Sequence, residues 1–455
     1  MTISGTVPVR NDRREIAGWL LYDWANSAFQ TTVVTVLIGP YLTALAQHDV
    51  GTNGVVLRLG PFGTVTALSL YPFCIAASVV LQVLLLPLLG ALVDYTGMKK
   101  RLMMAFCYAG AAATCLMFFV ARDRYLAGSA LLVAANFAFG VTLVLYNAFL
   151  NDITTPDLRD RVSSHGYAVG YLGGGLLLAG NLALLGAAAR LGISRELAVR
   201  ISLASAGVWW GGFSVITFSR LRERPAPRRG PAGRPLLAIG IAELGALWSR
   251  LRALPRTRRY LLAYMAFNDA IQTVISVSSV FLAQELFVAR GRPADEAFLM
   301  ELVLMVQFVA FAGALLFRSI AAALDTKPAI LLSLVLWTAI VVYAYAWLET
   351  IPQAWAMGGA LAVVLGGSQA LSRSLFSRMI PDGHEAAFFG LYEITERGTS
   401  WIGPLIFGAV AGATGSYRQA ILSLVALFAA GIVLLAATDT ERAIREAHAE
   451  WDVGR

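Results

Sequence analysis

Long apolar runs separated by short polar breaks make up most of this chain. A helix of roughly 18 apolar residues crosses the hydrocarbon core of a bilayer. Because only helices and closed barrels satisfy their backbone hydrogen bonds in lipid, the pattern predicts an all-α membrane protein with twelve membrane-spanning helices. The predicted spans are residues 17–46, 68–93, 101–121, 126–150, 163–189, 198–219, 259–288, 297–321, 328–348, 354–379, 386–412 and 417–437.

The first run carries polar side chains where lipid would penalise them. Asp23, Asn26 and Gln30 are spaced i, i+3 and i+7, so an α-helix places them on one face, and Ser27 joins them. A polar stripe in an otherwise apolar helix faces a water-filled cavity or the protein interior rather than lipid. The first helix therefore favours a carrier.

Composition agrees with a bilayer as the solvent of this chain. Hydrophobic residues make up 58% of the 455 residues and charged residues only 14%, which is more apolar surface than a soluble protein of this length can bury. The net charge of +8 is carried by loops between the apolar runs. No soluble module presents the basic face that nucleic-acid binding requires, so nucleic acid is not an expected partner.

The distribution of these cations predicts an orientation. Alternate loops differ in charge, and cytoplasmic loops carry the excess of Lys and Arg. Both termini and the long middle loop are therefore expected in the cytoplasm, in a multi-pass protein of the plasma (inner) membrane. The richer set of loops holds Arg10, Arg13, Arg14, Lys99, Lys100, Arg101, Arg159, Arg161, the arginines of the middle loop, Lys327, Arg378, Arg442 and Arg445.

Residues 220–258 divide the spans into six and six. This segment begins with an Arg- and Pro-rich stretch typical of a solvated linker. Apolar residues then recur at three- and four-residue steps, which indicates a short helix on the inner membrane surface. The predicted organisation is a six-helix bundle at 1–219, a basic cytoplasmic linker with this helix at 220–258, a second six-helix bundle at 259–437 and a cytoplasmic tail at 438–455.

The seventh span repeats a pattern found in the first. The pattern N-x-A-apolar-Q-T begins at Asn26 and again at Asn268, so Asn268, Asp269 and Gln272 form a counterpart of the first polar set. Two six-helix halves related by a parallel repeat are the plan of the major facilitator superfamily. We therefore expect the major facilitator fold.

A loop motif carries a more specific resemblance. Residues 90–101, G-A-L-V-D-Y-T-G-M-K-K-R, resemble the motif G-x-x-x-D-x-x-G-x-[RK]-[RK] of this superfamily. In the family this loop latches the two halves in one conformation; the alternative is that the cations only follow the positive-inside rule. In the corresponding loop after the eighth span only Lys327 survives, and Asp325 is out of register. The resemblance assigns the latch to Gly90, Asp94, Gly97, Lys99, Lys100 and Arg101.

Five further segments resemble the vacuole-effluxer branch, whose fungal members are autophagy-related vacuolar amino-acid exporters. They are residues 22–29, 146–150, 267–273, 367–376 and 388–394, the last followed by Gly403 and Pro404. Three positions depart from the branch: Asn151 replaces an expected proline, Ala270 a glycine and Ala387 a glutamate. These departures affect loop shape and charge rather than membership.

Ionisable residues inside predicted spans are the candidate functional groups. Such groups are costly in a membrane and mark substrate or ion paths by default. We hypothesise that Asp23 and Asp269 contribute to coupling or bind a substrate amine; the alternative is that they pair with helix-capping or interhelical donors. Arg373 either pairs with Glu393 or Glu396 or holds a substrate carboxylate.

The eleventh span adds a possible ion pair within one helix. Glu393 and Arg397 are spaced i, i+4, and Glu396 lies on the same helix. The remaining candidates are amides and rings that orient a small ligand in a largely apolar cavity. They are Asn147, Gln369, Tyr146, Tyr392 and Trp401.

Taken together, the residues predict a secondary active transporter rather than an enzyme. A small polar solute, with amino acids as the leading class by resemblance, would move by alternating access coupled to a proton or other ion. The alternative is an exporter of amphipathic compounds or drugs. The sequence has no phosphate-binding loop and no H-E-x-x-H motif, and its cysteines and histidines show no metal spacing, so no metal or cofactor is expected. Monomer is the superfamily's default state, and no cleaved signal peptide is expected.

Overall fold

The computed structural model describes residues 10–51, 54–58, 64–121, 124–224, 245, 247–292, 295–397 and 402–449. Within these residues, eleven continuous helices are long and apolar enough to cross a membrane. The last residues of the predicted tail, 450–455, and much of the predicted linker, residues 225–244, lie outside the described part.

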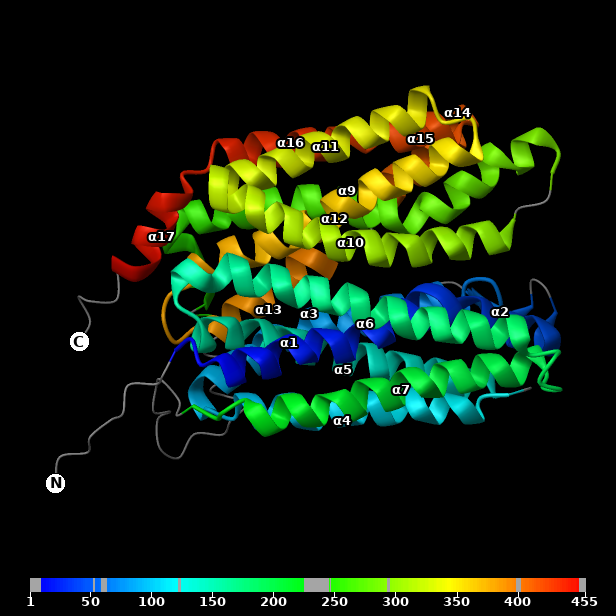
Figure 1. Ribbon diagram of the computed structural model, residues 1–455, viewed down its shortest axis with the longest axis horizontal. Coiled ribbons are helices and arrows are strands. Elements are labelled where there is room, and N and C mark those ends of the chain that lie inside the picture. Colours follow the sequence, from blue (N-terminus) through cyan, green and yellow to red (C-terminus); the bar gives the residue numbers. More distant parts are fainter. Residues whose placement is uncertain are drawn as a thin grey trace.

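The helices fall into two groups (Figure 1). The first group begins with α1 (Arg13–Ala28), a π-helical segment (Phe29–Leu37) and α2 (Ile38–Val50), which form one continuous span. It continues with α3 (Leu70–Thr96), α4 (Lys99–Leu116), α5 (Tyr125–Ile153), α6 (Arg159–Ala187) and α7 (Arg195–Arg220). We call this group the first bundle.

The second bundle contains the later helices. Its members are α9 (Pro255–Leu286), α10 (Glu296–Leu324), α11 (Thr326–Ala346), α12 (Ile351–Arg378), α13 (Glu385–Arg397), α14 (Ile402–Thr414), α15 (Tyr417–Ser423) and α16 (Val425–Ala436). The amphipathic α17 (Thr440–Ala449) follows them. Its Glu446 pairs with Arg256 at the start of α9, which ties the end of the described chain to this bundle.

The predicted eleventh span is the one that departs from a single long helix. The prediction covers residues 386–412, whereas the structure gives α13 and α14 as two helices of 13 residues each. Only α14 is strongly apolar, because α13 carries Glu385, Glu393, Glu396 and Arg397. These two helices take the place of the predicted eleventh span, so the twelve predicted spans correspond to eleven long apolar helices and one divided span.

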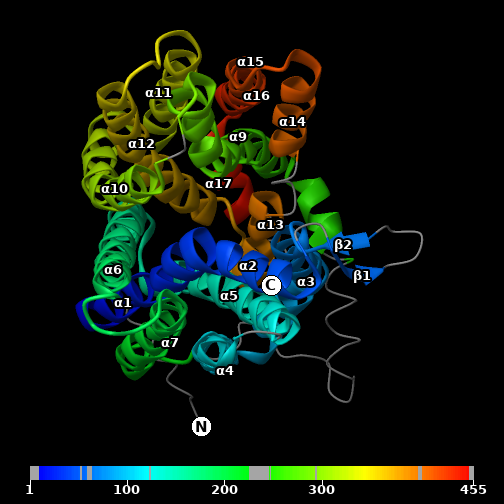
Figure 2. The same ribbon diagram turned by 90° about the vertical axis from the view of Figure 1, so that its right-hand side faces the viewer.

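A short hairpin between α2 and α3 was not predicted. Strand β1 (Val55–Arg58) pairs antiparallel with β2 (Thr64–Thr66), with Val55 opposite Thr66 and Arg58 opposite Thr64. The strands are too short for their alternation to be recognised in the sequence. They lie at the end of the molecule that faces the viewer in Figure 2, which we call the hairpin end.

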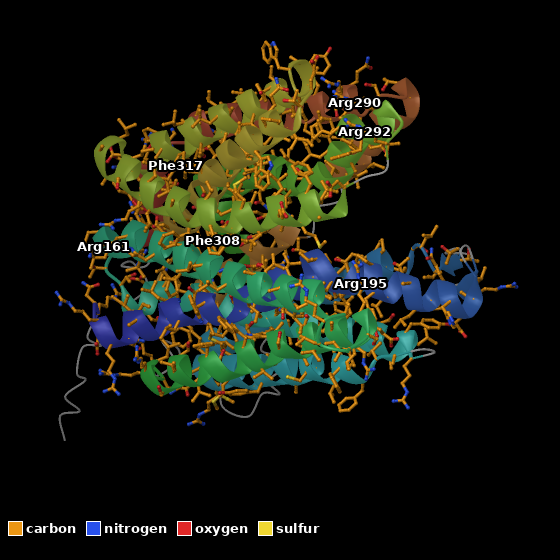
Figure 3. The ribbon with its side chains drawn as sticks, turned by 45° about the vertical axis from the view of Figure 1, so that its right-hand side comes forward. Arg161, Arg195, Arg290, Arg292, Phe308 and Phe317 are labelled. Atoms are coloured by element: carbon orange, nitrogen blue, oxygen red, sulfur yellow. The ribbon has the colours of Figure 1, made fainter. Side chains whose placement is uncertain are left out.

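The opposite end of the molecule, where α1 begins and α17 lies, is called the terminal end (Figure 1). Figure 2 shows α6 beside α10 and α13 beside α3, so each bundle contributes to the interface between them. The side-chain hydrogen bonds between the bundles gather toward the terminal end, as in Asn151 to Ser377 and Thr326 to Asp160. In Figure 3, Arg161 marks the terminal end, whereas Arg195, Arg290 and Arg292 lie toward the other.

Part of the predicted surface helix is described. Leu247, Leu251 and Leu254 are buried, in agreement with the predicted apolar stripe, whereas Trp248 is 54% exposed. The guanidinium of Arg252 stacks over the Trp248 ring, 5.4 Å from its centroid. The apolar face thus packs against the protein, and the position of this helix on the inner membrane surface stays a prediction.

Candidate functional site

A buried ion pair joins the two bundles. Asp23 on α1 and Arg373 on α12 are 8% and 2% exposed, and Arg373 Nη2 lies 3.6 Å from Asp23 Oδ2. The same carboxylate oxygen accepts a 2.6 Å hydrogen bond from the Tyr146 hydroxyl on α5. Asp23 is therefore stabilised by one donor of its own bundle and one cation of the other.

The guanidinium of Arg373 is held by further first-bundle groups. Its Nε donates to Ser163 Oγ at 2.9 Å, its Nη2 to the Ser163 carbonyl at 2.9 Å, and its Nη1 to Asn147 Oδ1 at 3.3 Å. The rings of Trp19, Tyr146 and Tyr167 lie 5.0, 5.5 and 4.3 Å from its central carbon. Together these contacts satisfy a buried cation that would otherwise be costly.

The absence of a side chain at Gly166 makes this arrangement possible. A Cβ placed there would lie 2.5 Å from Asp23 Oδ2 and 3.0 Å from Arg373 Nη2. Gly166 is on α6, one turn after Ser163, so the helix presents both the hydrogen-bond acceptors and the space for the guanidinium. Any larger residue must displace one member of the ion pair.

The sequence left the partner of Arg373 open between Glu393, Glu396 and a substrate. The structure instead places Asp23 against it. Glu393 is one step away: its Oε1 accepts a 3.1 Å hydrogen bond from Asn147 Nδ2, while Asn147 Oδ1 accepts from Arg373. Asn147 thus connects the arginine to a second buried carboxylate, on α13 of the second bundle.

Two more hydrogen bonds extend this contact between α6 and α12. Ser163 Oγ donates to the Ala370 carbonyl at 2.7 Å, and the Tyr171 hydroxyl donates to Gln369 Oε1 at 3.1 Å. Gln369 thus lies at the interface between the bundles.

Asp269 uses its carboxylate differently from Asp23. Its Oδ2 accepts a 2.7 Å hydrogen bond from the amide of Gly403, in the first turn of α14, and its Oδ1 is buried without a hydrogen bond among the described residues. A helix N-terminus has unsatisfied N–H groups and attracts negative charge. Asp269 therefore caps a helix of its own bundle, which is the capping alternative raised from the sequence.

The neighbouring polar residues also stay within the second bundle. Asn268 Nδ2 donates to the Glu396 carbonyl at 3.4 Å, and the Tyr264 hydroxyl donates to Glu396 Oε2 at 3.0 Å. The side chain of Arg397 lies outside the described residues, as does Trp401. The structure thus brings Glu396 and Asn268 together within the second bundle.

The polar stripe predicted on the first helix is only partly present. Asp23 and Asn26 are buried, but Gln30 is exposed. The reason is local: Gln30 lies in the π-helical segment, whose wider turn changes the angular spacing on which the i, i+7 prediction depends. Gln272, its counterpart on α9, is half-buried.

The latch motif contacts the other bundle through Asp94. Its two carboxylate oxygens accept hydrogen bonds from the amides of Ala386 and Ala387, at 3.1 and 2.9 Å, in the first turn of α13. A Cβ at Gly90 would lie 2.4 Å from the Ala386 carbonyl oxygen, so this glycine permits the close approach. Gly97 ends α3 with a φ of 66°, a conformation that favours glycine.

The cations of the motif have separate tasks. Lys99 pairs with Asp152 of its own bundle at 2.8 Å and lies over the Phe149 ring. Arg101 lies 3.3 Å from Glu223 but is 72% exposed, and Lys100 is half-buried. Exposed pairs of this kind contribute little.

A second carboxylate contact between the bundles comes from the start of a helix, whereas Asp94 lies near the end of one. Asp160, in the first turn of α6, accepts a 2.6 Å hydrogen bond from Thr326 Oγ1 and pairs with Arg378 at 2.6 Å. Asp325 ends α10 with a φ of 71°, as Gly97 ends α3 in the first bundle. Lys327 donates to the carbonyls of Ala436 and Thr438 within its own bundle.

Sequence reasoning missed Ser163, Tyr167 and Trp19 as partners of Arg373. Trp19 and Tyr167 read as ordinary aromatic residues of apolar helices, and Ser163 as the first residue of a span. Only the cost of a buried arginine signalled that acceptors and rings had to surround it.

Comparison with known proteins agrees with this architecture. Solved structures with similar folds include the human organic anion transporter MFSD10 (TM-score 0.66, 17% identity, 93% of this chain and 99% of that one). The Escherichia coli fucose:proton symporter FucP matches with a TM-score of 0.67 and 11% identity over 93% of this chain and 97% of its own. These likenesses establish the major facilitator fold.

Sequence relatives narrow the family. The MFS-type transporter YxiO of Bacillus subtilis is 30% identical over 422 residues, which cover 92% of this chain and 93% of that protein. Autophagy-related protein 22-1 of Penicillium rubens is 25% identical over 552 residues, 96% of this chain and 91% of that protein. The family model described as "Vacuole effluxer Atg22 like" matches residues 11–448. The chain is therefore a multi-pass membrane transporter, not an enzyme, and belongs to the Atg22-like vacuole effluxer family of the major facilitator superfamily.

Proposed function

We propose that this secondary transporter moves a small polar solute, an amino acid or a similar compound, by alternating access coupled to protons. The main support is the Asp23–Arg373 pair, because its two members belong to different bundles. A contact between bundles that rock against each other must form and break in every cycle. The resemblance of the sequence to vacuolar amino-acid exporters supports the solute. FucP, which has a similar fold, is a proton symporter, and this supports the proton as the coupling ion.

In this proposal the terminal end faces the cytoplasm of a plasma-membrane protein, and the structure corresponds to a state closed on that side. Two groups of contacts support it: Asp94 on the first turn of α13 and Asp160 against Thr326 and Arg378. Gly90, Asp94, Gly97 and Lys99 act as the latch of this closed state. Labelling of cysteines placed at each end in intact cells tests the orientation.

The transport test uses purified protein in proteoliposomes. A thermal-shift screen over amino acids, sugars, nucleosides and cationic drugs identifies a ligand, and its uptake is then measured with and without a pH gradient. We expect an amino acid or similar solute whose uptake follows the gradient. Uptake that responds only to amphipathic drugs would favour the alternative class of exporter.

Asp23 is the proposed coupling carboxylate. Asp23→Asn keeps an oxygen acceptor for Tyr146 but cannot exchange a proton. We expect its transport rate to lose the pH dependence of the unmodified chain. A pH profile unchanged by the substitution would remove Asp23 from coupling.

A further inference from the structure

The guanidinium of Arg373 lies in a pocket made by the other bundle. The arginine belongs to α12, but its hydrogen bonds to Ser163 and Asn147, its ion pair with Asp23 and its three ring contacts are made with first-bundle residues. The side chain thus crosses the interface and inserts into a cation-binding pocket. The first bundle carries all of these pocket residues on α1, α5 and α6.

This pocket has the chemistry of a receptor for a planar organic cation. Aromatic faces attract cations, and a guanidinium prefers several acceptors arranged around its fork. The pocket supplies three rings, one carboxylate, one amide oxygen, one hydroxyl and one carbonyl. Gly166 leaves the volume that the cation fills.

Separation of the bundles at the terminal end would withdraw Arg373 and leave this pocket without its cation. Asp23 would then keep the Tyr146 hydrogen bond but lose its counter-charge. An uncompensated carboxylate among aromatic rings is unfavourable. Binding of another cation in the vacated pocket therefore lowers the free energy. A solute that supplies this cation takes the place of Arg373.

Resting on the proposed transport function, we propose that this first-bundle pocket is the cation subsite for the solute. The solute then carries a guanidinium or a similar small organic cation, and Arg373 is a tethered competitor that occupies the subsite when the terminal end closes. Return of Arg373 displaces the solute's cationic group. One residue thereby links closure of the terminal end to release of the solute from this pocket.

The first test is rescue of Arg373→Ala by methylguanidinium. The full-length variant is purified, and its thermal unfolding is measured with millimolar methylguanidinium or with methylurea, which has a similar shape but no charge. We expect methylguanidinium to raise the Tm of Arg373→Ala by several degrees and methylurea to leave it unchanged. Arg101→Ala, which removes an exposed arginine, is the matched control and should not respond.

A second variant assigns the effect to the pocket. Asp23→Asn combined with Arg373→Ala removes the carboxylate, so the response to methylguanidinium should disappear. Equal responses in the double variant, in Arg373→Ala and in Arg101→Ala would overturn the proposal, because the ion would then bind elsewhere.

The unmodified protein provides a test that does not depend on the folding of a variant. Because methylguanidinium competes with Arg373, it should increase the population that is open at the terminal end, measured as the distance between spin labels on α6 and α10. An unchanged distance distribution contradicts the inference. If proteoliposomes transport a neutral or anionic solute and methylguanidinium has no effect, this inference fails and the transport function stands. If no solute is transported, the transport function itself fails.

Discussion

Asp23 and Asp269 lie on the first helix of each bundle, and both are buried. The sequence raised for both the same hypothesis, coupling or binding of a substrate amine, and the same alternative, pairing with capping or interhelical donors. The structure gives them different partners. Asp23 meets an arginine of the opposite bundle, whereas Asp269 caps α14 within its own bundle. A carboxylate contact across the moving interface must form and break during the transport cycle. One within a bundle contributes chiefly to the stability of that bundle.

The largest expected effect separates these two residues. Asp23→Ala leaves the buried Arg373 guanidinium without its counter-charge, and breaking a buried pair in this way costs about 3 kcal/mol. We expect transport to fall at least tenfold while the protein remains monodisperse. Transport near the level of the unmodified chain would show that the pair is dispensable.

Asp269→Ala should act on stability instead. Loss of a capping side chain costs about 1 kcal/mol, so thermal unfolding should begin at a lower temperature with transport only mildly reduced. Asp269→Asn retains an acceptor for the Gly403 amide and should behave like the unmodified chain. If Asp269→Asn abolished transport, Asp269 would act in transport as Asp23 does, and the two carboxylates would not differ in role.

Asp94 provides a cross-bundle cap that lies between these cases. Asp94→Asn keeps one acceptor for α13 but loses the negative charge at the helix N-terminus, an interaction of about 0.5–1 kcal/mol. We expect a shift toward the state open at the terminal end, with little change in unfolding temperature. Spin-label distances across that end check the shift, and a changed unfolding temperature without a changed distance would contradict it.

Arg101 should give the smallest effect. Its pair with Glu223 is exposed, and such pairs contribute roughly 0–1 kcal/mol. Arg101→Ala should therefore change neither the unfolding temperature nor transport beyond experimental error. Lys99→Ala removes a more buried pair with Asp152 and is the informative comparison within the same motif. A strong effect of Arg101→Ala would indicate a contact absent from this state.

Much of the fold follows from hydropathy alone, because lipid imposes both length and composition on a spanning helix. Eleven spans and the buried stripe of Leu247, Leu251 and Leu254 agree with the sequence prediction. The division of the eleventh span and the exposure of Gln30 were not foreseen. Both depend on local backbone geometry, α13 with its charges and the π-helical segment after Ala28, which periodicity does not encode.

The sequence identified residues of the candidate site but not which of them contact each other. Asp23 and Arg373 were named from the cost of ionisable groups in a span, and Asn147 as an amide that could orient a ligand. The structure brings the three together. The pairing of Asp23 with Arg373 depends on how two bundles dock, across 350 residues of sequence. Neither charge nor spacing within one helix contains that information.

The most direct test of the account measures the distance between the bundles at the terminal end. Spin labels replace the exposed residues Asp157, just before α6, and Ala322, near the end of α10, in a chain whose three cysteines are substituted. The unmodified pair should give a mainly short distance, Asp269→Asn the same distance, and Asp23→Asn a larger population at longer distance. Identical distributions for Asp23→Asn and Asp269→Asn would contradict the claim that Asp23 holds the two bundles together.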